Sequence, residues 1–199
     1  MPKHTNEPQR PRMTIAQAAA WVNPVNGDEV EDVKVRKAAA ADAEVIYENL
    51  KEMRDEQVQK RPDIVNKDED ILSLEEIAAA IDDASKLIFV AENVSGKVVG
   101  QIMCELEQSG EADDENSEEE PEEQKPAADK LIVANLFVQD VVRRQRIGTE
   151  LYQEACIEAK KIGCTDVELS CWSFDKEGMS FFEKQGYKPL LVTMEKKLR

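Results

Sequence analysis

The fold is decided by a stretch that reads Leu131-Ile-Val-Ala-Asn-Leu-Phe-Val138 and, after a short link, Arg143-Arg-Gln-Arg-Ile-Gly-Thr149. The first part is apolar and β-branched, which predicts a buried strand. Apolar residues then recur at helical spacing from Ile147 to Ile162, and Gly163 is a typical helix stop. A helix N-terminus offers unpaired N–H groups and a partial positive charge, which suit phosphate oxygens. The stretch therefore predicts a site for a phosphorylated cofactor.

Strand and helix patterns alternate on both sides of this stretch. Asp42 is expected to cap one helix, and Ser73-Leu-Glu-Glu76 is a capping box that opens another. The remaining elements are expected to be strands at 33–36, 87–92, 98–104 and 166–172, a helix at 178–184, and a β-rich segment at 187–198. This order predicts an α/β (α+β) fold with helices on both faces of one sheet.

The chain divides into three regions by composition. Residues 1–32 predict a partly disordered N-terminal extension, with a short helix or arm at 13–22, and residues 33–199 predict the domain itself. Residues 109–129 hold ten acidic side chains and one lysine, and they predict an acidic, disordered loop between strands.

The formal net charge is −16, which disfavours nucleic acid as a partner because no basic face could offset repulsion from the phosphates. An acidic chain would attract a cationic substrate such as an amine. The alternative is that the acidity serves solubility alone, since charge blocks are usually solvated.

The cysteines and the single histidine narrow the chemistry. Cys104, Cys156, Cys164 and Cys171 lack metal-ligand spacing, so we expect no metal, no disulfide framework and a cytoplasmic location. The only histidine is His4, which excludes a mechanism that needs a histidine in the folded domain. Without a histidine to activate it, Cys171 is expected to be a buried small hydrophobe. The sequence has neither a secretory signal nor an apolar run of about twenty residues, so no membrane association is expected.

The pattern over residues 33–198 resembles the GNAT superfamily of acyl-CoA N-acyltransferases, especially single-domain members of bacterial type. The family's cofactor motif, Arg/Gln-x-x-Gly-x-Gly/Ala, matches Arg143 to Thr149. A second signature, Asn-x-x-Ala-x-x-Phe-Tyr-x-x-x-Gly-Phe, matches Asp175-Lys-Glu-Gly-Met-Ser-Phe-Phe-Glu-Lys-Gln-Gly-Tyr187. The resemblance implies a mixed, largely antiparallel central sheet whose fourth and fifth strands splay apart.

The resemblance also implies acetyl-CoA as the cofactor and direct attack by a substrate amine. The pantetheine arm of acetyl-CoA would lie along the fourth strand, and its pyrophosphate would lie on the turn that follows this strand. The implied cofactor-binding residues are Leu136, Phe137, Val138, Arg143, Arg144, Gln145, Arg146, Gly148, Thr149, Asp175 and Phe182. A backbone N–H near Phe137 or Val138 could stabilise the developing oxyanion.

Some positions depart from the family pattern. Phe182 stands where a tyrosine often protonates the departing thiolate, and Asn135 lies where relatives often place a carboxylate base. Arg146 replaces the usual middle glycine. Asn135 and Ser170 are the candidate catalytic residues, with Ser170 and Trp172 lining the cleft floor.

Other candidates for the base are Glu92, Glu105 and Glu168, each of which could equally be a solvated strand residue. The first helix is followed by Arg61-Pro62-Asp63. In such folds this region often forms the acceptor pocket; the alternative is that these residues are a plain helix stop. The implied function is an amine N-acetyltransferase, a monomer or homodimer. The alternatives are a non-catalytic acyl-CoA-binding regulator and an interaction module that uses the acidic loop.

Overall fold

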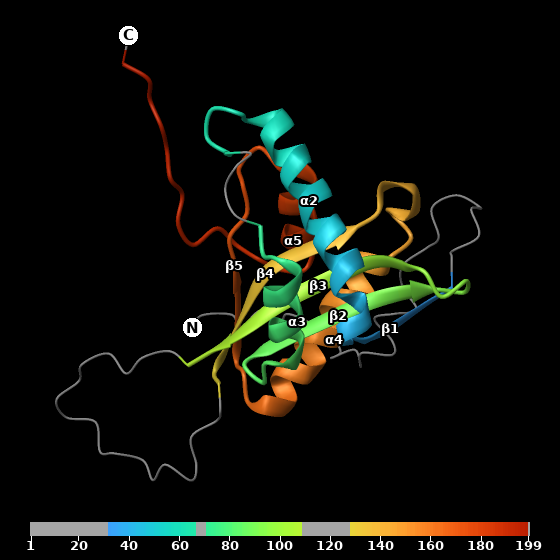
Figure 1. The fold of residues 1–199 in the computed structure, drawn as a ribbon. Coiled ribbons are helices and arrows are strands. Elements are labelled where there is room, and N and C mark those ends of the chain that lie inside the picture. Colours follow the sequence, from blue (N-terminus) through green and yellow to red (C-terminus); the bar gives the residue numbers. More distant parts are fainter. Residues whose placement is uncertain (1–31, 67–70, 109–127, 199) are drawn as a thin grey trace, which may run out of the picture. The chain divides into compact units, whose positions relative to one another are not determined.

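The computed structural model describes residues 32–66, 71–108 and 128–198. Its sheet has five strands in the order β1-β2-β3-β4-β5 (Figure 1). All neighbouring strands are antiparallel except β4 and β5, which run parallel. The strands are β1 (Val33–Lys37), β2 (Lys86–Asn93), β3 (Val98–Glu107), β4 (Lys130–Val138) and β5 (Asp166–Leu169). The predicted mixed, largely antiparallel sheet is therefore confirmed.

Helices cover both faces of the sheet, as predicted. In Figure 1, α2 (Ala43–Lys60) and α3 (Leu74–Asp82) lie on one face and α4 (Ile147–Ile162) on the other. Two separate cores result, because side chains alternate between the faces of each strand. Ile46 and Ile77 are fully buried with Val90 on the first face, and Leu151 is fully buried on the second. A fourth helix, α5 (Lys176–Lys184), follows β5 and contains no buried residue.

The start of α3 follows the predicted capping box. Ser73 Oγ accepts from the N–H of Glu76, whose carboxylate accepts from the N–H of Ser73. Asp42 does not act as the predicted side-chain cap of α2. It sits at the N-cap position, but its carboxylate accepts from the guanidinium of Arg36 at 2.7 Å and from the N–H of Ala39. A short 3₁₀ turn, η1 (Ala40–Asp42), leads into the helix instead.

The C-terminal end differs most from the prediction. Strand β5 ends at Leu169 rather than at residue 172, and residues 187–198 form no strand. A strand requires a partner, and among the described residues none lies beside this segment. The expected N-terminal extension and most of the expected acidic loop lie outside the described residues. At the end of that loop, Ala128 is buried and the carbonyl of Asp129 accepts from the N–H of Thr165. No helix in the described parts is long and apolar enough to cross a membrane.

Candidate functional site

Strand β4 loses its neighbour on one side halfway along its length. It pairs with β5 only from Lys130 to Val133. On the other side, its register with β3 shifts where Met103 and Cys104 face Asn135 and Val133, so Ala134 is an extra, bulged residue. From Ala134 to Val138, β4 is hydrogen-bonded to β3 alone. The expected divergence of the fourth and fifth strands thus begins at this bulge.

The backbone after β4 turns through two left-handed residues. A short 3₁₀ helix, η3 (Asp140–Val142), leads to Arg144 at φ +67° and Arg146 at φ +70°. They are the only non-glycine residues with positive φ among the described residues. Such conformations cost about 1–2 kcal/mol each and occur mainly where function demands them. Turns that combine right- and left-handed residues point successive N–H groups into a concavity that binds anions.

The first turn of α4 leaves backbone donors open beside this loop. The N–H groups of Thr149 and Glu150 donate to the carbonyl of Arg146 at 2.8 and 3.0 Å. For the N–H groups of Ile147 and Gly148, the described part of the chain supplies no acceptor. These donors point out of the positive end of the helix dipole, which favours an anionic ligand.

The arginines of the loop differ in what they contact. Arg143 donates to the carbonyl of Val138 at 2.9 Å and pairs with Asp140 at 2.6 Å and Glu56 at 3.4 Å. It therefore fixes the loop to β4 and to α2. Arg144 is 87% exposed and pairs with Glu177 at 3.3 Å, while Arg146 is exposed. Those two guanidinium groups are accessible to a ligand.

Gly148 leaves room above the first turn of α4. A Cβ atom placed there would lie 3.7 Å from both Phe181 and Val138, which is ordinary van der Waals contact. The packing of the protein alone therefore does not require glycine at this position. A ligand that approaches the backbone closely would require it.

Three residues of β4 are expected to line the pantetheine arm, and they would contact it through backbone groups rather than through side chains. Phe137 is buried, and Leu136 and Val138 pack against the α4 side of the core. Gln145 and Thr149 are half-buried beside the loop. The geometry thus brings together one strand edge and one helix start, both contributing main-chain groups.

The second family signature places Asp175 and Phe182 on α5. The carboxylate of Asp175 caps this helix by accepting from the N–H of Gly178 at 3.1 Å. A Cβ at residue 178 would clash with that carboxylate, so the glycine makes room for the cap. Asp175 therefore positions α5, an assignment that sequence reasoning did not make.

Phe182 packs in a cluster of aromatic rings. Its ring centroid is 5.4 Å from that of Tyr187 and 6.3 Å from that of Tyr152. The hydroxyls of the two tyrosines are hydrogen-bonded to each other at 3.1 Å. Burial raises the pKa of both hydroxyls, so they hold their protons at neutral pH. The family motif has a hydroxyl at residue 182 and phenylalanine at residue 187, whereas this chain has the two the other way round, a signal that was present in the sequence and missed.

Buried amides lie on the opposite face of β4. Asn49 on α2 donates to Gln101 on β3 at 2.9 Å, and both residues are buried. Gln101 Nε2 and Asn135 Oδ1 are buried without a hydrogen-bond partner among the described residues. Because an unsatisfied buried polar atom costs about 1–3 kcal/mol, these two atoms mark a place where a polar ligand group would be stabilised. Asn135 follows the bulge directly, so this place adjoins the divergence of β4 and β5.

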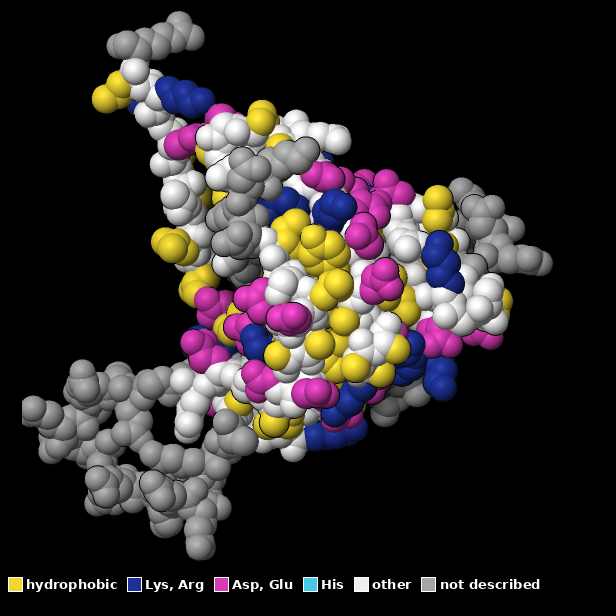
Figure 2. Space-filling view, in the orientation of Figure 1, with side chains coloured by type: hydrophobic (Ala, Val, Ile, Leu, Met, Phe, Trp, Pro, Cys, Tyr) yellow, Lys and Arg dark blue, Asp and Glu magenta, His cyan; other side chains and the backbone are white. Residues whose placement is uncertain are grey.

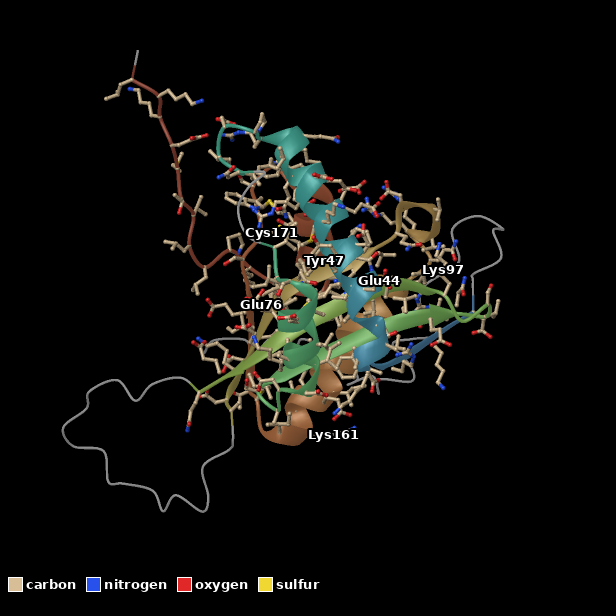
Figure 3. The ribbon with its side chains drawn as sticks, viewed as in Figure 1. Glu44, Tyr47, Glu76, Lys97, Lys161 and Cys171 are labelled. Carbon is tan, nitrogen blue, oxygen red and sulfur yellow. The ribbon has the colours of Figure 1, made fainter. Side chains whose placement is uncertain are left out.

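The residues after β5 are more exposed than expected. Ser170 and Cys171 are exposed, and Trp172 is 44% exposed and stacks on Phe174. The interpretation of Cys171 as buried was wrong, because β5 ends before it; Figure 3 shows it past that end of the strand. Partial desolvation and the charge of Asp175 raise the pKa of its thiol, which disfavours a thiolate nucleophile.

None of the candidate carboxylate bases is free. Glu92 pairs with Arg36 and Glu105 with Lys86, each at 2.7 Å, and Glu168 pairs with Lys130 at 3.2 Å. Each carboxylate pairs with a cation on a neighbouring strand. Their contacts are those of sheet residues. Over the described residues, no group of three or more metal-ligating side chains occurs.

One face of α2 is acidic. It carries Glu48, Lys51, Glu52, Asp55, Glu56 and Gln59. Because Glu56 also contacts Arg143, this face extends to the loop before α4. At the end of α2, Arg61 and Asp63 pair with Glu195 and Lys197 of the C-terminal segment. Residues 61–63, expected to form an acceptor pocket or a plain helix stop, thus contact the chain's own C-terminal segment.

Comparison with known structures supports the same fold. A mutant form of a Bacillus halodurans protein superposes with a TM-score of 0.69 at 19% identity, covering 83% of this chain and 99% of that one. An aminoglycoside acetyltransferase from an uncultured soil metagenomic sample gives 0.58 at 12% identity, with 84% and 99% covered. AAC(6')-Iy, in complex with the bisubstrate analogue CoA-S-monomethyl-acetylneamine, gives 0.54 at 11% identity, also with 84% and 99% covered.

Comparison by sequence identifies the family. No curated protein matches this chain. The profile described as the acetyltransferase (GNAT) family matches residues 46–187, which include the loop, the divergent strands and both signatures. Its members are acyltransferases that use acyl-CoA. The chain belongs to the GNAT family of acetyltransferases.

Proposed function

We propose that this chain is an acetyl-CoA-dependent N-acetyltransferase that acetylates a primary amine of a small molecule or protein. The observation that carries the proposal is the course of β4. The strand loses its β5 neighbour at Ala134 and leads, through η3, into the left-handed turn at Arg144 and Arg146. A ligand with an extended arm and a pyrophosphate needs these two features in this order.

The residues present fit such a cofactor. The open N–H groups of Ile147 and Gly148, with the accessible guanidiniums of Arg144 and Arg146, would hold the pyrophosphate. The backbone of β4 beyond the bulge would pair with the arm. Arg143 would act indirectly, by fixing the loop. When bound, acetyl-CoA supplies an acetyl thioester that a neutral amine can attack directly in a ternary complex.

Asn135 is proposed to orient the amine. Its Oδ1 atom is a buried acceptor without a partner among the described residues, so it can receive an N–H bond from an attacking amine. Gln101 Nε2 is a buried donor in the same situation and can hold a water molecule or a polar substrate group. Neither amide can take up a proton at neutral pH, so the amine would lose its proton to solvent.

The tyrosine pair supplies hydroxyl donors whose rings contact that of Phe182. Tyr187 and Tyr152 both stay protonated at neutral pH because burial raises the pKa of each hydroxyl. Their hydrogen bond to each other leaves one hydroxyl proton free to be donated elsewhere. Ser170 is a second candidate donor, since it is exposed just beyond β5.

A cationic amine is the proposed class of substrate. The acidic face of α2 has four carboxylates against one lysine and reaches the loop through Glu56. Three of the similar structures are named aminoglycoside acetyltransferases, and aminoglycosides are cationic amines. The four free cysteines support a reducing, cytoplasmic location.

The test follows the release of free thiol from acetyl-CoA with a panel of amines, alongside calorimetric binding of acetyl-CoA. We expect saturable binding, thiol release with cationic amines, and at least a tenfold loss of release in Asn135→Ala. Thr193→Ser, an exposed change outside the site, is the matched control and should leave release unchanged.

Two other outcomes are informative. Tight binding of acetyl-CoA without thiol release for any amine would contradict the proposal that the chain is an enzyme. It would favour a non-catalytic acyl-CoA-binding regulator, a function with which the phenylalanine at residue 182 agrees. Absence of acetyl-CoA binding would reject the cofactor assignment itself. In that case the acidic loop would be tested next as a binding segment for a basic partner.

A further inference from the structure

Only one half of the buried Gln101 amide has a partner. The side chain of Asn49 on α2, 3% exposed, donates from Nδ2 to Gln101 Oε1 at 2.9 Å. Gln101 is itself 0% exposed, and its Nε2 has no hydrogen-bond partner among the described residues. Since Asn49 engages the oxygen of the Gln101 amide, the nitrogen is the atom left to bind a ligand. That ligand must present an acceptor, because an amide N–H only donates.

Asn135 lies on the same face of the sheet, diagonally across from Gln101. In the register of β3 and β4, Asn135 faces Met103 and Phe137 faces Gln101. Directly opposed residues share a face of the sheet, as do residues two apart on one strand. Met103 belongs to the core on the α2 side, so the two amides lie on that side. Diagonal neighbours are about 7–8 Å apart, and one small molecule can therefore contact both amides.

The two atoms without partners are of opposite kinds. Asn135 Oδ1 accepts hydrogen bonds, whereas Gln101 Nε2 donates them. A molecule that carries a donor and an acceptor a few bonds apart would satisfy both atoms. Asn135 is half-buried, and Ala134 before it is exposed where β5 ceases to pair with β4. The amides thus lie next to the place where the two strands diverge, which is where acetyl transfer is proposed.

The acceptor that Gln101 binds is expected to be a neutral oxygen. Asn49 and Gln101 are both uncharged, and burying a carboxylate without a cation costs far more than burying a hydroxyl or an ether. The net charge of −16 also opposes an anionic substrate. Figure 2 looks onto the face that α2 and α3 cover and shows Asp and Glu side chains spread over it. A cationic amine with a neutral oxygen fits both this surface and the buried amides.

We propose that the acceptor substrate is an amine with a hydroxyl or ether oxygen roughly two or three carbon atoms from its nitrogen. Gln101 Nε2 donates to that oxygen, and Asn135 Oδ1 accepts from the amine. Asn49 is a positioning residue, because it fixes the direction of the Gln101 amide. This inference rests on the proposed function, which places the reacting amine at Asn135.

The test measures thiol release from acetyl-CoA with amines of equal size. Methoxyethylamine has an ether oxygen at the position where butylamine has a methylene group and N-methylethylenediamine has an N–H group. Gln101→Met keeps the length of the side chain and removes Nε2. We expect it to lower kcat/KM for the ether, relative to butylamine, by about tenfold or more. Because the same ratio is compared between proteins, the different basicities of the amines cancel.

Met103→Leu is the matched control. It changes a buried side chain on the same face of β3 with little change in volume, and it should leave the ratio of the two amines unaltered. Gln101→Met leaves Asn49 without its acceptor, so the double variant Asn49→Leu, Gln101→Met is measured as well and should show the same lost preference. Asn49→Leu alone frees the Gln101 amide to turn. Its preference for the ether over N-methylethylenediamine should therefore narrow several-fold.

Two results with an active enzyme would overturn this inference and leave the proposed function standing. One is an equal loss with the ether and butylamine in Gln101→Met, because Gln101 would then act on a group common to every reaction, such as the acetyl oxygen. The other is an amine ratio that Gln101→Met does not change.

A protein that releases no thiol with any amine would contradict the proposed function instead. Calorimetric binding of the same amines to the CoA-bound chain then decides the inference separately. Tighter binding of the ether than of butylamine, lost in Gln101→Met, would support the oxygen site, and equal binding of the two would overturn it.

Discussion

Single residues explain why the loop before α4 departs from its family pattern. Arg146 has a left-handed backbone, and the family motif has glycine at this position because glycine adopts that conformation without strain. An arginine there retains a positive charge beside the open donors of α4. Charge is thus gained at the expense of backbone strain.

Arg146→Gly should therefore stabilise the protein. We expect the free energy of unfolding in urea to rise by about 0.5–1 kcal/mol, since relief of the left-handed strain exceeds the added entropy of the unfolded chain. Arg146→Ala removes the same charge but keeps the strain, so it should not be stabilised. Equal stability of the two variants would contradict this explanation.

Gly148→Ala should separate packing from binding. The added Cβ has room in the protein, so the thermal midpoint should stay the same or rise. The same atom would enter the space of a bound pyrophosphate, and we expect acetyl-CoA to bind at least tenfold more weakly by calorimetry. Gly100→Ala is a contrast, because its Cβ would lie 2.9 Å from the carbonyl of Phe137 and should destabilise the fold. Unchanged cofactor affinity in Gly148→Ala would count against this pyrophosphate site.

The displaced hydroxyl can be tested by moving it back. Phe182→Tyr restores the family's donor, and we expect it to raise the rate of thiol release. Tyr187→Phe removes the hydroxyl bonded to Tyr152 and should lower that rate several-fold. If Tyr187→Phe changed stability alone, with the rate per folded molecule unaltered, the pair would be structural.

At the scale of elements, Arg36 joins β1 to β2 and to η1, the turn that leads into α2. Its guanidinium contacts Asp42 and Glu92, each at 2.7 Å. The hydrogen bond from Arg36 holds the pKa of Asp42 below its ordinary value, against the opposing effect of burial. Because the folded-state pKa is the lower one, this contribution to stability is present above the unfolded pKa of about 3.9 and disappears as pH falls through the folded pKa.

Asp42→Asn should consequently be less stable than the natural chain at pH 7, by about 1–2 kcal/mol. Below about pH 4 the difference should shrink, since the natural carboxyl becomes protonated too. Urea unfolding at a series of pH values measures both effects. Asp55→Asn removes the same charge at an exposed position of α2, and it should show neither the loss of stability nor its pH dependence. If the stability difference between Asp42→Asn and the natural chain stayed constant with pH, the role assigned to the Arg36–Asp42 pair would be refuted.

Local elements were predictable because their signals are local. The capping box at Ser73 and the apolar stripe of α4 each fix a helix within a few residues. The segment 187–198 shows the limit of such signals. Its composition is that of a strand, but strand formation depends on a partner that the sequence of one segment does not specify. The same reason explains Cys171, whose expected burial rested on two extra residues of β5.

The candidate site also has parts that the sequence predicts and parts that it does not. The loop from Arg143 to Gly148 could be assigned from its motif, and its cofactor role stays a prediction. The contacts of Tyr152 with Tyr187 and the buried pair Asn49 and Gln101 could not be assigned. Those contacts join residues 35 or more positions apart, and only the folded chain brings them together.

At the scale of the whole molecule, the charge of −16 should act on substrate capture. An acidic protein attracts a cationic amine over distances that salt screens. We expect KM for a doubly charged amine to rise several-fold between low and about 0.5 M salt, with kcat nearly constant. A singly charged amine of similar size is the control and should respond less. A KM independent of salt would mean that the acidity serves solubility alone.

The ladder between β4 and β5 has a consequence for how the protein opens. It holds four residue pairs, and α5 beyond it has no buried residue. In amide hydrogen exchange, β5 and α5 should therefore form a separate cooperative unit that opens far more often than β2 and β3. A ligand seated along β4 would slow exchange in that unit first. The least protected part of the sheet would then report directly on whether the donor molecule is bound.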